Sequence, residues 1–316
     1  MIEVSGIRVP LKALDGTDER ELAACRRALA RRLGVRDRDL ALVERRRRSI
    51  DARRRGNVQL TFTLRAELAP GASARDGRGV RAVDERRYDF PAPVGRASER
   101  PVVVGAGCAG LFCALALARA GLEPLLVERG DDAARRSEAV RRHDETGELD
   151  PESNIQFGVG GAGTFSDGKL QTGTKSPAHR LILETFVAAG AQPQILWDAK
   201  PHIGSDVLPR VVTDIVRQIE EAGGEVRTRC RMSDLDVSGG RVRSVTLVRA
   251  DDAGVEHEER VETGCVVLAC GHSARDVLEL LRGRGVTMER KTFAMGVRIE
   301  HLQADIDRAL YGGAAG

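Results

Sequence analysis

One stretch of the chain, PVVVGAGCAGLFCALALARAGLEPLLVERG at positions 101–130, restricts the possible folds more than any other feature. An apolar run from Val102 to Val104 ends in a glycine-rich turn, and an alanine- and leucine-rich segment with helical character follows the turn. A second apolar run at 124–127 then ends at Glu128. This order is typical of a buried strand, a tight turn, a helix and a second, parallel strand. It predicts an α/β fold with a Rossmann-like parallel sheet.

The three glycines of the turn have the spacing that a bound dinucleotide requires. Gly105 allows a tight turn, Gly107 lets the backbone approach a pyrophosphate, and Gly110 lets the helix pack closely on the strand. The helix N-terminus offers N–H groups and a partial positive charge to phosphates. Glu128 lies 18 residues after Gly110, where an acid can accept hydrogen bonds from ribose hydroxyls. The alternative is a βαβ unit that holds no nucleotide.

The order of the later segments favours FAD over NAD as the dinucleotide. A strand is expected at 226–230, a hairpin around 238–240, a further strand near 257–261, and an apolar strand at 265–271 that ends in glycine. NAD-dependent dehydrogenases usually continue with βαβ units and lack such an antiparallel excursion. We therefore predict an FAD-binding domain over 93–285. It contains the βαβ unit at 101–128, the antiparallel excursion at 235–262 and the return strand at 265–271.

Residues 1–92 are expected to form a small β-α-β-β module and a linker. Strands are predicted at 2–9, 40–50 and 57–67, and a helix at 18–33 with Asp18 as a possible N-cap. The module is basic, with 22 Lys and Arg against 14 Asp and Glu, and the excess gathers in the segment Arg45–Arg55. Two interpretations stay open: a solvated face of an edge strand, or a binding surface for RNA or another acidic partner.

Composition sets further bounds on the chain of 316 residues. With 41% hydrophobic and 31% charged residues it resembles a soluble globular protein, and it contains no apolar run of ~18 residues that could span a membrane. The start lacks the apolar core of a secretory signal, so a cytoplasmic location is expected. The six cysteines form no CxxC pair, and we interpret them as small buried hydrophobic residues rather than as disulfides. The His and acid spacing suggests no metal site.

Several longer strings carry a resemblance to a known family. They are SNIQFGVGGAGTFSDGKL at 153–170, KPHIGSD at 200–206, LACGHSARD at 268–276, GVRIEH at 296–301 and, in the N-terminal module, SIDAR at 49–53. Together these strings resemble the bacterial and plastid family of uncharacterised FAD-dependent dehydrogenases, over nearly the whole chain. The resemblance implies a glutathione-reductase-type FAD-binding domain with an inserted substrate domain, of which 286–316 would be the start. Family members continue well past this point, so an incomplete polypeptide is expected.

The resemblance also implies a set of cofactor-binding residues. A second glycine loop, with Gly160, would approach the pyrophosphate or the flavin, and the return strand would close the nucleotide site at its final glycine. Cys108 stands where proline is usual in the turn, and its backbone still fits the pattern. The expected cofactor-binding set is Gly105, Ala106, Gly107, Cys108, Ala109, Gly110, Glu128, Arg129, Gly161, Gly163, Thr164, Met232 and Gly271.

Two side chains are candidates for catalysis. Lys169, paired across Gly168 with Asp167, could stabilise a reduced flavin or bind an acidic substrate, or could belong to a surface ion pair. His272 could transfer a proton, or could be merely packed while Ser273 and Asp276 cap a helix. The leading hypothesis is an FAD-dependent oxidoreductase that acts on a small molecule, with NAD(P)H as a possible electron donor. The alternatives are an RNA-associated flavoprotein and an FAD-stabilised binding protein without turnover.

Overall fold

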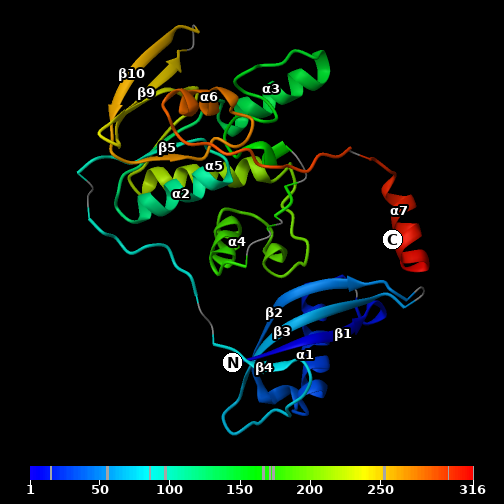
Figure 1. Ribbon diagram of the computed structural model, residues 1–316. Coiled ribbons are helices and arrows are strands. Elements are labelled where there is room, and N and C mark those ends of the chain that lie inside the picture. The colour runs from blue at the N-terminus through cyan, green and yellow to red at the C-terminus, as the bar shows by residue number, and fades with distance from the viewer. Residues whose placement is uncertain are drawn as a thin grey trace. The chain divides into compact units, whose positions relative to one another are not determined.

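The computed structural model describes residues 1–14, 16–54, 57–84, 87–95, 98–165, 168–170, 172, 175–251, 254–297 and 299–315. The chain divides into two compact units (Figure 1). The N-terminal unit contains residues 1–87, 194–201 and 292–316, and the parallel-sheet unit contains residues 88–193 and 202–291.

The N-terminal unit is a four-stranded antiparallel sheet with one helix packed on it. The strands β1 (Ile2–Pro10), β2 (Leu40–Asp51), β3 (Gln59–Leu68) and β4 (Val80–Ala82) are arranged in the order β2-β3-β1-β4. Helix α1 (Asp18–Leu33) buries Leu29 and Leu33 against Phe62 and Leu64 in one core. The helix 18–33 is where the sequence predicted it. Its N-cap is Thr17, whose hydroxyl accepts a bond from the Arg20 N–H, so the prediction of Asp18 was wrong. Strand β4 lies in the segment expected to be a linker.

A segment from the middle of the chain completes the N-terminal unit. Residues 197–199 run beside β2, with the Arg48 N–H donating to the Trp197 carbonyl at 2.6 Å and the Ala199 N–H donating to the Arg48 carbonyl at 2.8 Å. The Arg48 guanidinium is bidentate to Asp198, and the Arg45 guanidinium lies 4.1 Å from the centre of the Trp197 ring. The chain therefore leaves the parallel-sheet unit after residue 193 and returns to it at residue 202.

The parallel-sheet unit contains the predicted α/β arrangement. Strands β5 (Val102–Val104), β6 (Leu125–Val127), β7 (Glu225–Arg227) and β11 (Val266–Leu268) form a parallel sheet in the order β11-β5-β6-β7. Strands β8 (Cys230–Ser238), β9 (Arg241–Ala250) and β10 (Glu256–Glu262) form an antiparallel sheet. The helices are α2 (Cys108–Arg119), α3 (Ala133–Thr146), α4 (Ala178–Ala188), α5 (Leu208–Glu221) and α6 (Arg275–Gly283).

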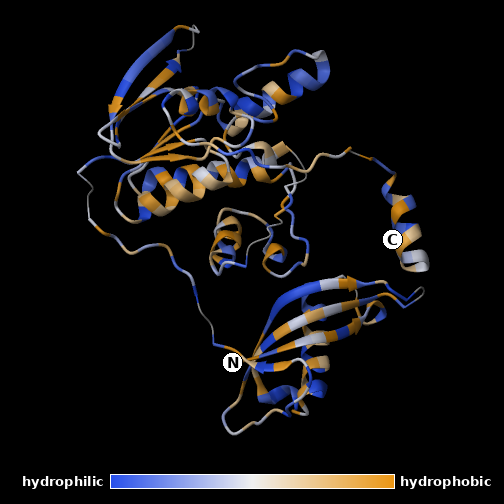
Figure 2. Ribbon diagram, in the orientation of Figure 1, coloured by the Kyte–Doolittle hydropathy of each residue, from blue (hydrophilic) through white to orange (hydrophobic). Residues whose placement is uncertain are grey.

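These elements form layers around the parallel sheet. Alternate residues of β5 and β6, such as Val102 and Leu125, pack with Met232 and Leu247 of the antiparallel sheet and Val277 of α6. Helices α2 and α5 contact each other and cover the opposite face (Figure 1). Figure 2 shows the apolar parallel strands as the interior of this unit and β10 as a largely polar edge. The carboxyl ends of β5, β6 and β11 therefore open at one edge, where ligands bind in open α/β sheets.

Three sequence expectations for this unit need correction. The strand expected at 226–230 is two strands, because Arg229 has a φ of +51° and turns the chain between β7 and β8. The return strand at 265–271 is shorter, with its ladder limited to Val266–Leu268. That strand lies at the sheet edge and is only partly buried, with Leu268 39% exposed, rather than a fully buried strand. No helix among the described residues has the length and apolar character needed to cross a membrane.

Helix α7 (Gln303–Tyr311) belongs to the last segment of the N-terminal unit. The preceding stretch at 292–302 has no regular secondary structure in its described residues. The assignment of 286–316 to the start of a substrate domain stays a prediction.

Candidate cofactor site

The glycine turn after β5 has a backbone that other residues would not fit. Gly105 has a φ of +100°, and a Cβ there would lie 2.6 Å from the Ala269 carbonyl oxygen beside β11. A Cβ on Gly110 would lie 1.7 Å from the Gly105 carbonyl oxygen, so the first turn of α2 rests directly on the strand end. These two glycines are required by packing, whatever the site binds.

A second glycine loop meets the turn face to face. The Gly160 N–H donates to the Ala106 carbonyl at 2.8 Å, and a Cβ on Gly161 would lie 2.9 Å from the Gly107 Cα. Gly107 itself has a φ of −72°, and a Cβ there would have ordinary van der Waals contact, 3.7 Å from Gly161. Close approach of two bare backbones at the N-terminus of α2 forms a cradle for an anion.

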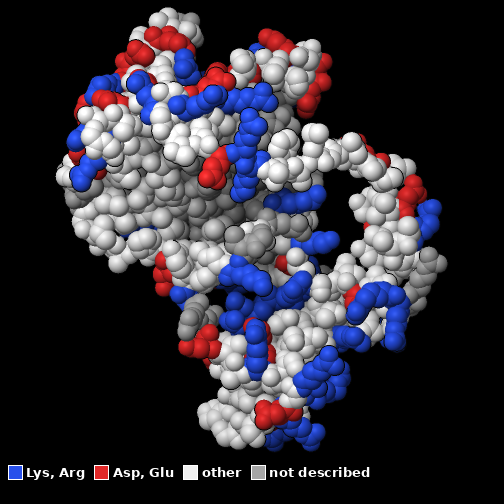
Figure 3. Space-filling model, viewed as in Figure 1, with Lys and Arg blue, Asp and Glu red and all other residues white. Residues whose placement is uncertain are grey.

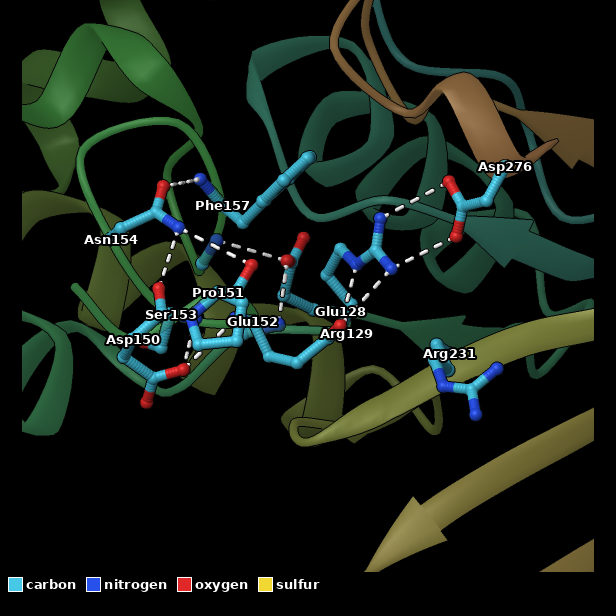
Figure 4. Close-up of polar contacts among 12 residues, drawn as sticks. Glu128, Arg129, Asp150, Pro151, Glu152, Ser153, Asn154, Phe157, Arg231 and Asp276 are labelled. Atoms are coloured by element: carbon cyan, nitrogen blue, oxygen red, sulfur yellow. Dashed lines mark hydrogen bonds and ion pairs between the residues drawn. The ribbon is translucent and has the colours of Figure 1, made fainter. Parts of the chain in front are cut away.

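Glu128, at the end of β6, organises both glycine segments. Its buried carboxylate accepts hydrogen bonds from the N–H groups of Ala106 at 2.7 Å, Gly130 at 3.0 Å and Gly158 at 3.0 Å, and Figure 4 shows part of this network. A carboxylate has about four acceptor positions, so about one is left for a ligand hydroxyl. The sequence assigned Glu128 to a ribose and gave no sign of its structural role.

A cavity of about 310 Å³ opens where these elements meet. It is bounded by the two glycine segments, by the start of β8 and by the segment after β11. Of the residues expected to bind the cofactor, the following line it: Gly105, Gly107, Cys108, Ala109, Glu128, Arg129, Gly161, Gly163, Met232 and Gly271. His272 also lines it and is exposed.

Three members of the expected set are not among the lining residues. Ala106 and Gly110 support the cavity wall without lining it: the Ala106 N–H donates to Glu128, and Gly110 packs against the Gly105 carbonyl. Thr164 is completely buried, and a Cβ on Gly160 would lie 2.1 Å from its Oγ1, so its side chain packs beneath the loop. Thr164 is thus absent from the described lining of this cavity, and its role in cofactor binding stays a prediction.

Arg129 lines the cavity, and its guanidinium is already paired with two carboxylates. Figure 4 shows the guanidinium between Glu152, at 2.9 Å, and Asp276, at 2.9 Å, and it lies 4.6 Å from the centre of the Phe157 ring. Burial alone would lower the pKa of Arg129, but the two carboxylates outweigh it and raise that pKa. Asp276 is thus a partner of Arg129, and neither it nor Ser273 makes a capping bond to α6.

Lys169 lies at a second cavity and is separated from His272. This cavity, of about 520 Å³, lies between α2, α4, α5 and the loop that follows Gly160. Lys169 forms an isolated β-bridge with His202, and the Ile203 N–H donates to the Gly168 carbonyl at 3.0 Å. The expected partner Asp167 lies outside the described residues. The two catalytic candidates therefore do not share one cavity.

The six cysteines are all free; two of them are buried, two are partly buried and two are exposed. Cys108, Cys230 and Cys270 line the first cavity, and Cys108 also lines the second. Cys108 is open to the cavities and Cys265 is exposed, which corrects the expectation that all six are buried. Although Cys108 faces the cavities, the surrounding protein removes water from its thiol. This desolvation raises the pKa of Cys108, so the thiol stays protonated near neutral pH. The described residues contain no cluster of His, Cys, Asp and Glu suited to a metal ion.

Arg136 of α3 is an important residue that the sequence interpretation missed. Its side chain is completely buried, and it donates to the carbonyls of Asn154 at 2.9 Å, Ile155 at 3.1 Å, Gly158 at 3.2 Å and Val159 at 2.9 Å. It therefore fixes the loop that carries the second glycine segment. In sequence it stands in a highly charged helix, where nothing distinguishes it from its exposed neighbours.

Three arginines of the basic run in the N-terminal unit form ion pairs with acids. Figure 3 shows Lys and Arg gathered on this unit with acids among them. Arg45 pairs with Asp18 and Glu21, and its side chain is 7% exposed; Arg48 pairs with Glu21 and Asp198. Arg53 pairs with Asp51, and Arg55 lies outside the described residues. These three arginines therefore serve ion pairing within the N-terminal unit.

One of the family models that match the chain covers the glycine turn. Residues 101–144 match the family model described as FAD dependent oxidoreductase, and residues 1–67 match a domain of unknown function. The comparisons support the broad family of FAD-dependent oxidoreductases. The matched segment contains the glycine turn, helix α2 and Glu128.

Two further similarities extend beyond the matched segment. An "Uncharacterized protein" of Clostridium beijerinckii is 34% identical over 303 residues, which is 92% of this chain and 54% of that protein. The chain thus spans about half the length of this curated relative. Among solved structures, THI4 of Thermovibrio ammonificans is 20% identical, with a TM-score of 0.38, over 60% of this chain and 64% of that chain.

The glycerol-3-phosphate dehydrogenase of Bacillus halodurans complexed with FAD is another solved structure with some similarity. It is 14% identical with a TM-score of 0.37, over 58% of this chain and 37% of that chain. Both TM-scores are low, so neither solved structure supports a functional assignment.

Proposed function

We propose that the first cavity binds the ADP half of FAD and that the protein catalyses an oxidation-reduction of a small organic molecule. The pyrophosphate would lie against Gly107 and Gly161 at the N-terminus of α2. The remaining acceptor position of Glu128 would take an adenosine ribose hydroxyl, and β8 at Met232 would lie beside the adenine. When bound, FAD supplies the hydride chemistry, while the protein supplies position and electrostatics.

The observation that carries this proposal is the bare cradle between the two glycine segments. Gly105, Gly110 and Gly161 would each place a Cβ within 3 Å of another backbone atom, which explains them by packing. Gly107 is different, because a Cβ there would have ordinary contacts. The fold alone does not require glycine at this position, and this supports a ligand that approaches the Gly107 backbone.

This difference gives a test that separates folding from binding. The purified protein is expected to show flavin absorbance, with FAD released on denaturation. Gly107→Ala should keep the thermal unfolding temperature and lose most of the FAD, whereas Gly283→Ala, at a position with no atom within 4 Å of a Cβ, should keep both. A colourless wild-type protein that FAD does not reconstitute, or a Gly107→Ala protein with full FAD content, would refute the proposal.

Turnover needs a test of its own, because an FAD-stabilised binding protein would give the same absorbance. Anaerobic addition of NADH or NADPH, or of a pool of cell metabolites, should bleach the flavin if the protein is an oxidoreductase. Bleaching by NADPH or NADH alone would identify the electron donor. Bound flavin that no reductant or metabolite bleaches would favour the binding protein. The neutralised arginines give no support to an RNA-associated function.

A further inference from the structure

Strand β2 distributes its arginines between the two faces of the N-terminal sheet. Helix α1 packs on one face (Figure 1), and Arg45 and Arg48 point to it because both pair with Glu21 of that helix. The register between β2 and β3 shifts between Arg45 and Arg47, and this irregularity places Arg47 beside Thr63. Thr63 alternates with buried core residues of β3, so Thr63 and Arg47 point away from α1. The ion pairs at Glu21 therefore do not include Arg47.

The face of the sheet that points away from α1 carries two adjacent rows of hydroxyl and arginine side chains. The register partners are Ser49, Thr61 and Arg8 in one row and Arg47, Thr63 and Ser5 in the next. These six residues form what we call the open face. Arg8 and Arg47 are exposed, and neither forms a hydrogen bond or an ion pair with a carboxylate among the described residues.

The two arginines of the open face are close enough to hold one small anion between them. Neighbouring strands lie ~4.8 Å apart, and successive residues on one face of a strand lie ~7 Å apart. The Cα atoms of Arg8 and Arg47 are therefore ~12 Å apart, diagonally across β3. Both guanidinium groups can reach inward over the hydroxyls of Thr61 and Thr63, which lie between them.

Thr61, at the centre of the open face, has a hydroxyl without a partner. Its Oγ1 is buried and forms no hydrogen bond, whereas the neighbouring Ser49 hydroxyl donates to the Thr61 carbonyl at 3.3 Å. Buried polar atoms are normally hydrogen-bonded, so an unpaired one calls for an explanation. An acceptor oxygen of a ligand at the centre of the open face would satisfy this hydroxyl.

The surroundings of the open face leave its positive charge in place. At one end a cavity of about 440 Å³ has Arg8 and Asp51 in its described wall. Both arms of the Arg53 guanidinium bond the Asp51 carboxylate, and these hydrogen bonds lower the pKa of Asp51, so an arginine already balances this acid. At the other end the next row is neutral as a whole, since it consists of Glu44, Arg65, Glu3 and Arg81.

We propose that the open face binds a phosphate monoester of a small molecule. Arg8 and Arg47 each offer a planar fork of donors to the dianion, and the hydroxyls of Thr61 and Thr63 donate to its remaining oxygens. The six residues include no aromatic side chain on which a nucleobase could stack, and this favours a single phosphate group over an RNA strand. The site lies in the N-terminal unit and does not rest on the proposed function.

The first test compares a monoester with a diester. The protein, saturated with FAD to keep phosphate out of the cradle at Gly107, is titrated by calorimetry with methyl phosphate and with dimethyl phosphate at pH ~8. The monoester then carries two charges and the diester one, so the monoester should bind about 10-fold more tightly. Equal affinities, tighter binding of the diester, or no binding of either would overturn the proposal.

Variants test the location of the site. Arg8→Gln and Arg47→Gln should each weaken the binding of methyl phosphate by about 10-fold or more. Arg27→Gln, at an exposed residue of α1 on the other side of the sheet, should leave it unchanged. Thr61→Val should weaken binding and keep or raise the unfolding temperature, because a methyl group replaces an unpaired buried hydroxyl. Wild-type affinity in both arginine variants would overturn the proposal.

A short single-stranded RNA decides between a small ligand and a polymer. If RNA bound more tightly than methyl phosphate and both arginine variants weakened it, the open face would be an RNA surface and the monoester assignment would fall. The outcome is separable from that of the proposed function. If the protein takes up no FAD, the same comparison of open-face variants on the flavin-free protein still decides this proposal, while Gly107→Ala reports on the cradle alone.

Discussion

The buried guanidinium of Arg136 allows a prediction whose size can be worked from the structure. It donates four hydrogen bonds to backbone carbonyls of residues 154–159 and has no carboxylate within bonding distance among the described residues. Hydrogen bonds to a charged group contribute ~1.5–3 kcal/mol each. Burial lowers the pKa of Arg136 to about 10, and this corresponds to a cost of ~3 kcal/mol for holding the charge.

The balance favours the wild-type residue by several kcal/mol. Arg136→Met keeps the apolar stem and removes all four donors, so we expect a loss of ~4 kcal/mol, within the range for breaking a buried polar network. With a urea m-value of ~2 kcal/mol per molar, the midpoint should fall by ~2 M. Far-UV circular dichroism would follow the transition. FAD affinity should fall too, because the guanidinium holds the loop of Gly160 and Gly161.

The neighbouring residue supplies the control. Arg135 is on the same helix, and its side chain is 67% exposed. Arg135→Met should change the unfolding free energy by no more than ~0.5 kcal/mol. If Arg136→Met shifted the midpoint no more than Arg135→Met does, the four hydrogen bonds would not hold the loop and the reasoning would be refuted.

Three further predictions concern other parts of the chain. Gly161→Ala should destabilise the parallel-sheet unit as well as remove FAD, because its Cβ would meet backbone at 2.9 Å, and unchanged thermal stability would contradict this. Burial acts to raise the pKa of Glu3, yet hydrogen bonds from two arginines hold that pKa below its ordinary value of 4.5, so Glu3 should contribute stability above pH ~4.5 that is lost as pH falls through the lowered pKa. In urea titrations, Glu3→Gln should make the free energy of unfolding depend less on pH below ~4.5. The same pH dependence in the variant and the wild type would count against this prediction. Arg48→Met should lower the urea midpoint that is followed by the fluorescence emission of Trp197, the single tryptophan, while the FAD content stays constant. If the variant lost FAD as well as Trp197 stability, the effect of this contact would not be confined to the N-terminal unit.

Local pattern was enough to predict the elements that frame the cofactor site. Apolar runs on either side of a glycine turn predicted β5, α2 and β6, since both strands are buried on two faces and read as continuous apolar runs. The helix α1 was predictable for a different reason, because its apolar residues recur with helical spacing and are buried on one face. Gly105 and Gly110 were predictable because the turn requires residues without a Cβ.

Residues whose role depends on distant partners could not be predicted. Glu128 receives N–H groups from three separate positions, up to 30 residues away, and Arg136 reaches carbonyls that lie 18 to 23 residues along the chain. The second cavity draws its wall from three helices and a loop, so no single stretch of sequence describes it. Asp276 looked like a capping residue because its long-range partner Arg129 leaves no local trace.

The contact of residues 197–199 with β2 has a practical consequence for cutting the chain into pieces. A fragment that starts at residue 88 would retain Trp197 and Asp198 but lose Arg45 and Arg48, their partners. It would carry an uncovered indole ring and an unpaired carboxylate in the middle of an otherwise intact domain. A fragment that ends at residue 87 would instead leave the edge of β2 open to pair with other chains. Because residues 194–201 belong to the N-terminal unit, a deletion that removes this unit as a whole must take them out together with residues 1–87 and 292–316.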